Sequence, residues 1–101
     1  MTTERQARML RYEVPVDDQW HTFDVPAMTR IQHLVSRRPE VVEFWAELWE
    51  PLDGEEPLTT PRTFRVYGTG QPYDPRNLDY KGTALAAGGQ LVWHLFEQVK
   101  P

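Results

Sequence analysis

Proline and glycine interrupt this chain so often that long regular elements have little room. Nine prolines and six glycines fall among 101 residues, and the uninterrupted segments between them are short. Segments of this length favour strands over long helices, and clusters of these two residues mark turns. The spacing therefore predicts a protein built of short β-strands.

Six segments between these breaks have the alternating or continuously apolar pattern of strands. They are residues 10–14, 20–25, 31–35, 62–67, 80–86 and 90–99. Gly88-Gly89 predicts a two-residue hairpin between the last two. Gly68-Thr69-Gly70 predicts a tight turn, because the third glycine and the helix of a dinucleotide-binding fingerprint do not follow it.

Residues 40–49 fit two different periodicities. At helical spacing the apolar stripe consists of Val41, Phe44, Trp45 and Leu48. At strand spacing one side consists of Val42, Phe44, Ala46 and Leu48, and the other of Glu43, Trp45, Glu47 and Trp49. The local pattern by itself slightly favours the helix.

The length of the chain is that of one domain. We expect an N-terminal tail at residues 1–8 and a single β domain at residues 9–101. The expected fold class is all-β, a small antiparallel barrel or sandwich of six or seven short strands. The predicted core is Tyr12, Val14, Phe23, Val25, Ile31, Leu34, Phe44, Leu48, Phe64, Val66, Leu85, Trp93 and Leu95.

Composition excludes several classes of function. Without cysteine the chain has no disulfide, no thiolate nucleophile and no cysteine-based zinc site. No apolar run is long enough to cross a bilayer and no signal peptide is visible, so we expect a protein of the bacterial cytosol without a membrane partner. Of the net charge of −4, residues 39–61 contribute seven acids and no base. Such a patch argues against DNA binding on that face and suits a basic protein surface.

Residues that could carry catalysis or bind a metal are present but poorly arranged. The histidines His21, His33 and His94 share no metal-ligand spacing. Ser36 is the only serine and has no nucleophile elbow around it. Paired carboxylates such as Glu43 and Glu47 lie on a predicted solvent face, where a shifted pKa is not expected. We therefore expect neither an enzyme nor a cofactor.

Two sets of residues are candidates for binding. If residues 41–49 form a strand with Phe44 inward, Trp45 and Trp49 point outward between Glu43 and Glu47 and form a partner-binding face. The alternative is a closed sandwich whose two faces are both covered. Arg37, Arg38 and Arg65 could instead gather into an anion site for a phosphate or nucleotide.

Several stretches of the chain resemble a family of short, uncharacterised proteins of bacteriophages, prophages and bacteria. They are RYEVP at residues 11–15, FWA at 44–46, RTFRVYGTGQP at 62–72, YKGT at 80–83 and LVWHLFE at 91–97. The resemblance spans roughly residues 10–97 and implies a compact β domain in which residues 44–46 lie in a strand. We adopt the strand on that ground. The resemblance implies no activity or catalytic residue.

The function expected from the sequence is a non-catalytic protein-interaction module of phage or prophage type that self-associates. The second hypothesis is a small-ligand protein that binds a nucleotide or phosphate at the three arginines. The third is a minor structural component of a virion, which would place the chain outside the cytosol. Nucleic acid is not an expected partner.

Overall fold

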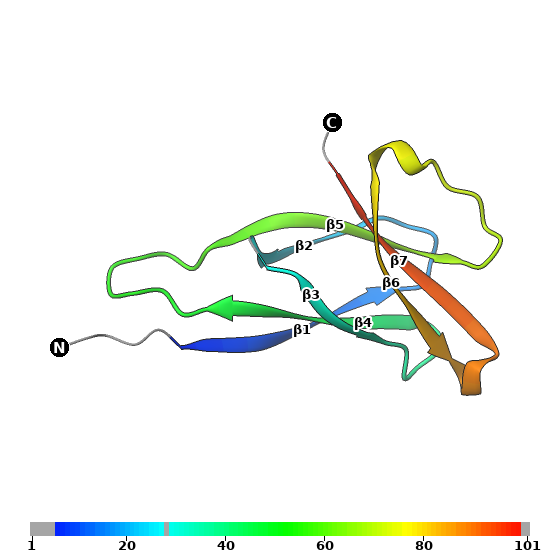
Figure 1. Cartoon of the computed structure of the whole chain (residues 1–101), viewed down its shortest axis with the longest axis horizontal. Coiled ribbons are helices and arrows are strands. Elements are labelled where there is room, and N and C mark those ends of the chain that lie inside the picture. The colour runs from blue at the N-terminus through cyan, green and yellow to red at the C-terminus, as the bar shows by residue number, and fades with distance from the viewer. Residues whose placement is uncertain (1–5, 28, 100–101) are drawn as a thin grey trace.

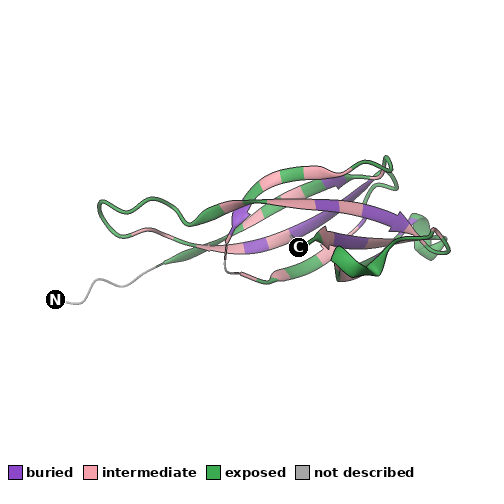
Figure 2. Ribbon diagram, turned by 90° about the horizontal axis from the view of Figure 1, so that it is seen from above, coloured by how far each residue is buried: buried purple, intermediate pink, exposed green. Residues whose placement is uncertain are grey.

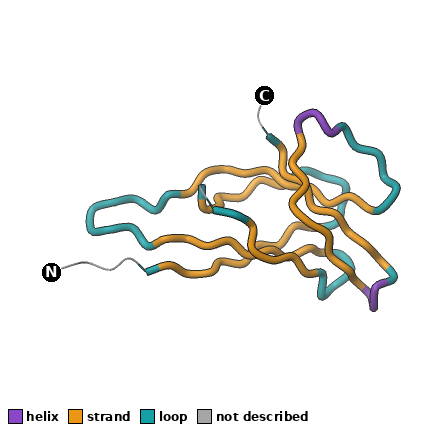
Figure 3. Tube along the Cα trace, in the orientation of Figure 1, coloured by secondary structure: helices purple, strands orange, loops and turns teal. Residues whose placement is uncertain are grey.

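The computed structural model describes residues 6–27 and 29–99, and in them seven strands form two antiparallel sheets. One sheet has the order β1 (Ala7–Pro15), β4 (Val41–Trp49), β3 (Ile31–Val35). The other has the order β2 (His21–Pro26), β5 (Thr59–Gly68), β7 (Leu91–Gln98), β6 (Leu78–Ala86). The two sheets pack face to face (Figures 1 and 3). The all-β prediction is confirmed, and the architecture is a sandwich.

Residues 41–49 form a strand, as the family resemblance implies, although their local pattern favours a helix. β4 lies between β1 and β3, so backbone hydrogen bonds hold both of its edges. Val42, Phe44 and Ala46 are fully buried on its inner side. Tertiary pairing on both edges therefore overrides the helical periodicity.

The core lies between the sheets, along the middle of the strands (Figure 2). Six predicted core residues are buried there: Val14, Val25, Phe44, Phe64, Val66 and Leu95. Five more are partly buried against them: Tyr12, Phe23, Ile31, Leu34 and Trp93. The ring centroids of Phe44 and Phe64 lie 4.8 Å apart, so an aromatic contact joins the two sheets directly.

Leu85, predicted to be in the core, is 62% exposed, and this prediction is wrong. β6 carries a bulge between Tyr80 and Gly82, where the pairing with β7 shifts by one residue. One inserted residue exchanges the two faces of a strand beyond it. Ala84 and Ala86 consequently face the core, and Leu85 faces outward.

The hairpin between β6 and β7 is longer than the predicted two residues. The last paired residues are Ala86 and Leu91, and the short 3₁₀ turn η2 (Ala87–Gly89) lies between them. Ala87, Gly88 and Gly89 all have positive φ. The chain thus reverses over a four-residue loop.

The predicted turn at residues 68–71 is confirmed, with Gly70 at φ 88° and the Gln71 N–H donating to the Gly68 carbonyl.

The molecule is elongated, with extents of 55 × 34 × 16 Å. At one end β1, β4 and the loop at residues 50–58 extend beyond the rest of the sandwich (left in Figure 1). We call this region the projecting end.

β1 begins at Ala7, so two residues of the predicted tail belong to the strand, while residues 1–5 lie outside the described part. A second 3₁₀ turn, η1 (Pro75–Asn77), precedes β6. The described residues include no helix long and apolar enough to cross a membrane.

Candidate functional site

The four residues predicted to bind a partner all belong to the outer side of β4, but they differ in exposure. Trp49 is 50% exposed at the projecting end. Trp45 is half-buried, and its ring centroid lies 5.8 Å from that of His33 on β3. Glu47 is also half-buried. Trp49 is therefore the member of this set with the most surface available for contact.

Glu43 is only 2% exposed, which corrects its expected position on a solvent face. The Arg37 guanidinium donates to both carboxylate oxygens, from Nε and Nη2, at 2.7 Å each. Arg11 on β1 donates a third hydrogen bond, also at 2.7 Å. Two side chains, rather than the core, cover the carboxylate. The hydrogen bonds from Arg37 hold the pKa of Glu43 below its ordinary value, and the charges of both arginines add to this effect.

The three arginines expected to form an anion site do not come together. Arg37 is bound to Glu43, and Arg38 donates to Glu13 at 2.7 Å on the same outer face. Arg65 lies on the outer face of the other sheet, with its guanidinium carbon 4.5 Å from the ring centroid of Tyr67. The sandwich separates Arg65 from the other two, so they share no anion.

Exposed apolar side chains gather at the projecting end. Met9 is 53% and Leu58 is 64% exposed. Met9 pairs with Glu47 and is the diagonal neighbour of Trp49 on the same face of the sheet. Trp49 and Leu58 together line a hollow of about 360 Å³. We call Met9, Trp49 and Leu58 the apolar patch.

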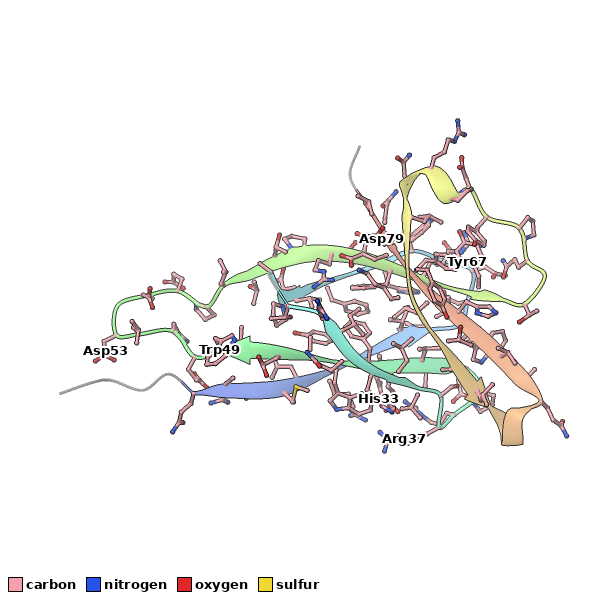
Figure 4. All side chains as sticks on the ribbon, in the orientation of Figure 1. His33, Arg37, Trp49, Asp53, Tyr67 and Asp79 are labelled. Atoms are coloured by element: carbon pink, nitrogen blue, oxygen red, sulfur yellow. The ribbon has the colours of Figure 1, made fainter. Side chains whose placement is uncertain are left out.

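Acidic residues surround the apolar patch. Glu55 and Glu56 line the same hollow as Trp49 and Leu58, and Asp53 lies at the tip of the loop (Figure 4). The loop is shaped by a tight turn in which the Glu55 N–H donates to the Leu52 carbonyl at 2.9 Å. Gly54 supplies the positive φ of 84° that this turn requires. The charge pattern noted in the sequence is thus concentrated around an apolar centre.

β1 is an edge strand, and half of its backbone groups face away from β4. Val16 donates to the Glu40 carbonyl and Glu50 donates to the Gln6 carbonyl, which sets the phase of the ladder. In an antiparallel pair such hydrogen-bonded positions recur at every second residue. The even-numbered residues of β1 therefore bond to β4. The N–H and C=O groups of Ala7, Met9, Arg11 and Glu13 point toward the open edge.

The histidines and the serine take part in separate local contacts. His21 lies 2.8 Å from Asp17, while both ring nitrogens of His94 bond to threonine hydroxyls. Ser36 is buried and donates to two backbone carbonyls, those of Arg38 and Val41. Within residues 6–27 and 29–99 no three potential metal-ligating side chains come together.

One largely buried ion pair was not predicted from the sequence. Arg62 and Glu97 form a bidentate ion pair at 2.6 and 2.7 Å, and both side chains are largely buried. Burial by itself raises the pKa of Glu97, but the hydrogen bonds and charge of Arg62, together with Lys81, outweigh it and leave that pKa lowered. Arg62 shares its alternation with Phe64 and Val66, so the strand pattern already placed it on the inner face.

The sequence profile of a domain of unknown function (DUF7352) matches residues 5–101. Because this match spans nearly the whole chain, the protein belongs to that family. No curated protein and no solved structure matches the chain. Membership of an uncharacterised domain family, expected from the sequence, is confirmed.

Proposed function

We propose that this member of the family is a non-catalytic protein-interaction module that self-associates through its projecting end. The observation that carries the proposal is the apolar patch. A half-exposed tryptophan beside two exposed aliphatic side chains, with a polar rim, is the composition of an interface centre. Leu85 and Leu91, two exposed leucines of the strands, belong to the opposite end of the sandwich (Figure 1).

The open edge of β1 supports a second copy of this chain as the occupant. Met9 belongs to both the apolar patch and that edge. An unpaired edge is a template for another strand, and an antiparallel edge is complementary to itself under two-fold symmetry. A second copy therefore satisfies the exposed backbone groups of Ala7 and Met9 and covers the patch at the same time.

The non-catalytic part of the proposal is supported by what the reactive side chains already do. Ser36 donates to backbone carbonyls, His21 is engaged with Asp17, and His94 bonds to Thr69 and Thr83. The resemblance noted in the sequence supports a phage or prophage setting, in the host cytosol. The same interface repeated in a larger assembly is the virion alternative.

Replacing the apolar patch tests the proposal. We expect sedimentation velocity and native mass spectrometry of the wild-type protein to show a discrete oligomer. Trp49→Ala combined with Leu58→Ala should weaken it by roughly 30-fold in dissociation constant, the effect of losing about 2 kcal/mol at a tryptophan-centred interface.

The matched control is Leu85→Ala, which removes an equally exposed leucine from the other end of the molecule. This variant should associate as the wild type does. A wild-type protein that stays monomeric, or an oligomer that the double variant leaves intact, would refute self-association through the projecting end.

A further inference from the structure

A second feature, at the opposite end of the molecule from the apolar patch, has the chemistry of a small-molecule site. On the outer face of the four-stranded sheet, the end of β5, the loop that follows it and the strands β6 and β7 line a partly open cavity of about 200 Å³. Tyr67, part of its lining, lies far from Trp49 and Asp53 along the long axis of the molecule (Figure 4). The cavity is therefore separate from the proposed interface.

Aromatic rings form one wall of this cavity. Phe96 lies at the centre of the cluster, with ring centroids of Tyr67, Tyr73 and Tyr80 at 5.4, 4.4 and 5.7 Å. Phe96 and Tyr67 are buried, while Tyr73 and Tyr80 remain about half exposed at the cavity. Two aromatic rings that hold their position and keep an open face offer a surface on which a ligand ring can pack.

Thr69, Tyr80 and His94 supply polar groups of the lining, and hydrogen bonds that pass through Thr83, behind the lining, join them into a chain. The Tyr80 and Thr83 hydroxyls share a hydrogen bond, and Thr83 bonds to Nδ1 of His94 at 2.9 Å. The other ring nitrogen, Nε2, bonds to the Thr69 hydroxyl at 2.8 Å. Hydroxyl groups both donate and accept, so this chain can accommodate a ligand group of either kind.

The cavity is preformed on its loop side. Gln71 accepts a hydrogen bond from the Gly68 N–H at 3.0 Å and donates to Asp18 at 3.0 Å. The backbone N–H of Gln71 donates to the Gly68 carbonyl. These bonds hold the turn at residues 68–71 in place before any ligand arrives, which lowers the entropic cost of binding.

The lining offers a ligand no fixed charge. Among the described residues that line the cavity there is no carboxylate, lysine or arginine. The nearby Arg65 does not line the cavity: its guanidinium packs on Tyr67 and Trp20, 3.8 Å from Asp18, and its buried Nε has no hydrogen-bond partner among the described residues. A nucleobase edge has fixed donors and acceptors and calls for matching amides. The lining holds one side-chain amide, that of Gln71, which uses one N–H and one oxygen lone pair to hold the turn and so has only one of each left for a ligand.

From these observations we infer that the cavity binds one neutral sugar ring. A pyranose has a C–H face that packs on an aromatic ring, whose own face carries partial negative charge. Its edge carries hydroxyls that both donate and accept, as the chain from Tyr80 to Thr69 does. The inference adds a ligand site to the proposed interaction module and does not depend on self-association.

Titration followed by protein NMR tests the inference with stated probes. Methyl β-glucopyranoside, methyl β-galactopyranoside and N-acetylglucosamine are added to the ¹⁵N-labelled full chain, with adenosine and uridine in parallel. We expect at least one sugar to shift the amide signals of Thr69, His94 and Phe96 with a dissociation constant on the order of 1 mM, usual for so small a ligand. Binding of a nucleoside with no binding of any sugar would overturn the assignment.

Two variants of Tyr80 and one matched control sharpen the test. Tyr80→Ala should weaken sugar binding by about tenfold, and Tyr80→Phe, which keeps the ring, by no more than about threefold. Leu85→Ala lies on the same strand and the same face but outside the cavity, and it should bind as the wild type does. Two outcomes would refute the site. One is equal weakening of sugar binding by Tyr80→Ala and Leu85→Ala in folded proteins. The other is a wild-type protein whose amide signals do not shift at a sugar concentration about ten times the expected dissociation constant.

Discussion

At the scale of single residues, Glu43 shows how an outward position on a strand becomes buried. The residue lies on the outer side of β4, yet its carboxylate is covered by Arg11 from β1 and Arg37 from the turn after β3. Glu13, on the same face, pairs with Arg38, and its side chain stays 42% exposed. Two carboxylates with similar partners thus differ in how far water reaches them.

That difference predicts different costs for removing the two charges. Glu43→Gln should lower the free energy of unfolding by about 1–2 kcal/mol at neutral pH, because both arginines lose a charge-assisted partner. Glu13→Gln, the control, should cost less than about 0.5 kcal/mol, since its ion pair is exposed to solvent. Urea denaturation measures both values. Equal costs would contradict the distinction.

The pH dependence of the same variant follows from the lowered pKa of Glu43. A carboxyl whose pKa is lower in the folded protein stabilises the fold above its unfolded pKa, and this stability is lost as the pH falls through the folded value. The ordinary value is 4.5. The difference in unfolding free energy between wild type and Glu43→Gln should therefore be full at pH 7 and shrink below pH 4.5. A constant difference down to pH 2.5 would exclude this linkage.

At the scale of elements, the phase of the β1 ladder assigns opposite roles to adjacent residues. The N–H of Leu10 lies in the ladder with β4, while the N–H of Met9 points to the open edge. Proline removes one N–H and is tolerated in strands only where that group is not in the ladder. Substitution by proline should therefore destabilise the protein much more at Leu10 than at Met9.

Met9→Pro should cost less than about 1 kcal/mol of unfolding free energy, and Leu10→Pro about 3 kcal/mol or more. The variants Met9→Ala and Leu10→Ala are the controls, because they report the loss of each side chain without the loss of an N–H. Urea denaturation of the four proteins gives the comparison. If both prolines cost the same after this correction, Leu10 and Met9 do not differ in their ladder bonding and the assigned phase is wrong.

The elements also differ in how well their sequence predicts them. β2 and β5 follow their alternation because both faces of each strand meet the environment that the pattern implies. β3 does not, since its pairing with β4 shifts between Ile31 and His33, and Ile31 and Leu34 both pack against the core. β4 contradicts its own local periodicity, since two neighbouring strands decide its conformation. In β6 the pattern is correct up to the bulge at Tyr80 and inverted after it. A bulge has no reliable signal in alternation alone, although Gly82 marks its position.

At the scale of the whole molecule, Gly82 brings the two sheets together where β6 meets β3. A Cβ atom placed on Gly82 would lie 3.0 Å from Cδ1 of Leu34. Gly82 also has φ 154°, a conformation that L-residues rarely adopt. The close approach of the sheets at this end therefore depends on a missing side chain.

Gly82→Ala should destabilise the protein by about 2–3 kcal/mol, from backbone strain and overpacking together. Gly54→Ala is the control: it also has positive φ, but its added Cβ would have no neighbour within 4 Å, so the cost should be about 1 kcal/mol. Leu34→Ala should cost less in the Gly82→Ala background than in the wild type, because it relieves the contact. Strictly additive costs in a double-mutant cycle would contradict a direct contact between the two residues.

Some of the candidate surfaces can be recognised from the sequence, and others only from the structure. The sequence by itself proposes Trp49 and the acidic segment as candidates, because large apolar residues among charged ones can be recognised without knowing the fold. The aromatic cavity escaped it, since Tyr67, Tyr73, Tyr80 and Phe96 come from three strands and a loop. The anion site expected at Arg37, Arg38 and Arg65 does not form, because the fold places Arg65 on one outer face of the sandwich and the other two arginines on the opposite one. Their shared charge in the sequence says nothing about this placement.

The sequence by itself indicated an all-β domain, because prolines and glycines interrupt it often, but its local pattern left residues 40–49 open between helix and strand. It also determined which side chains alternate together along most strands. Only the tertiary structure decided which of the two sides of each strand is buried by other parts of the chain. Coverage of Glu43 comes from Arg11 and Arg37, and coverage of Phe96 from Tyr73 on a distant loop. Such contacts join residues far apart in the chain, and local periodicity holds no information about them.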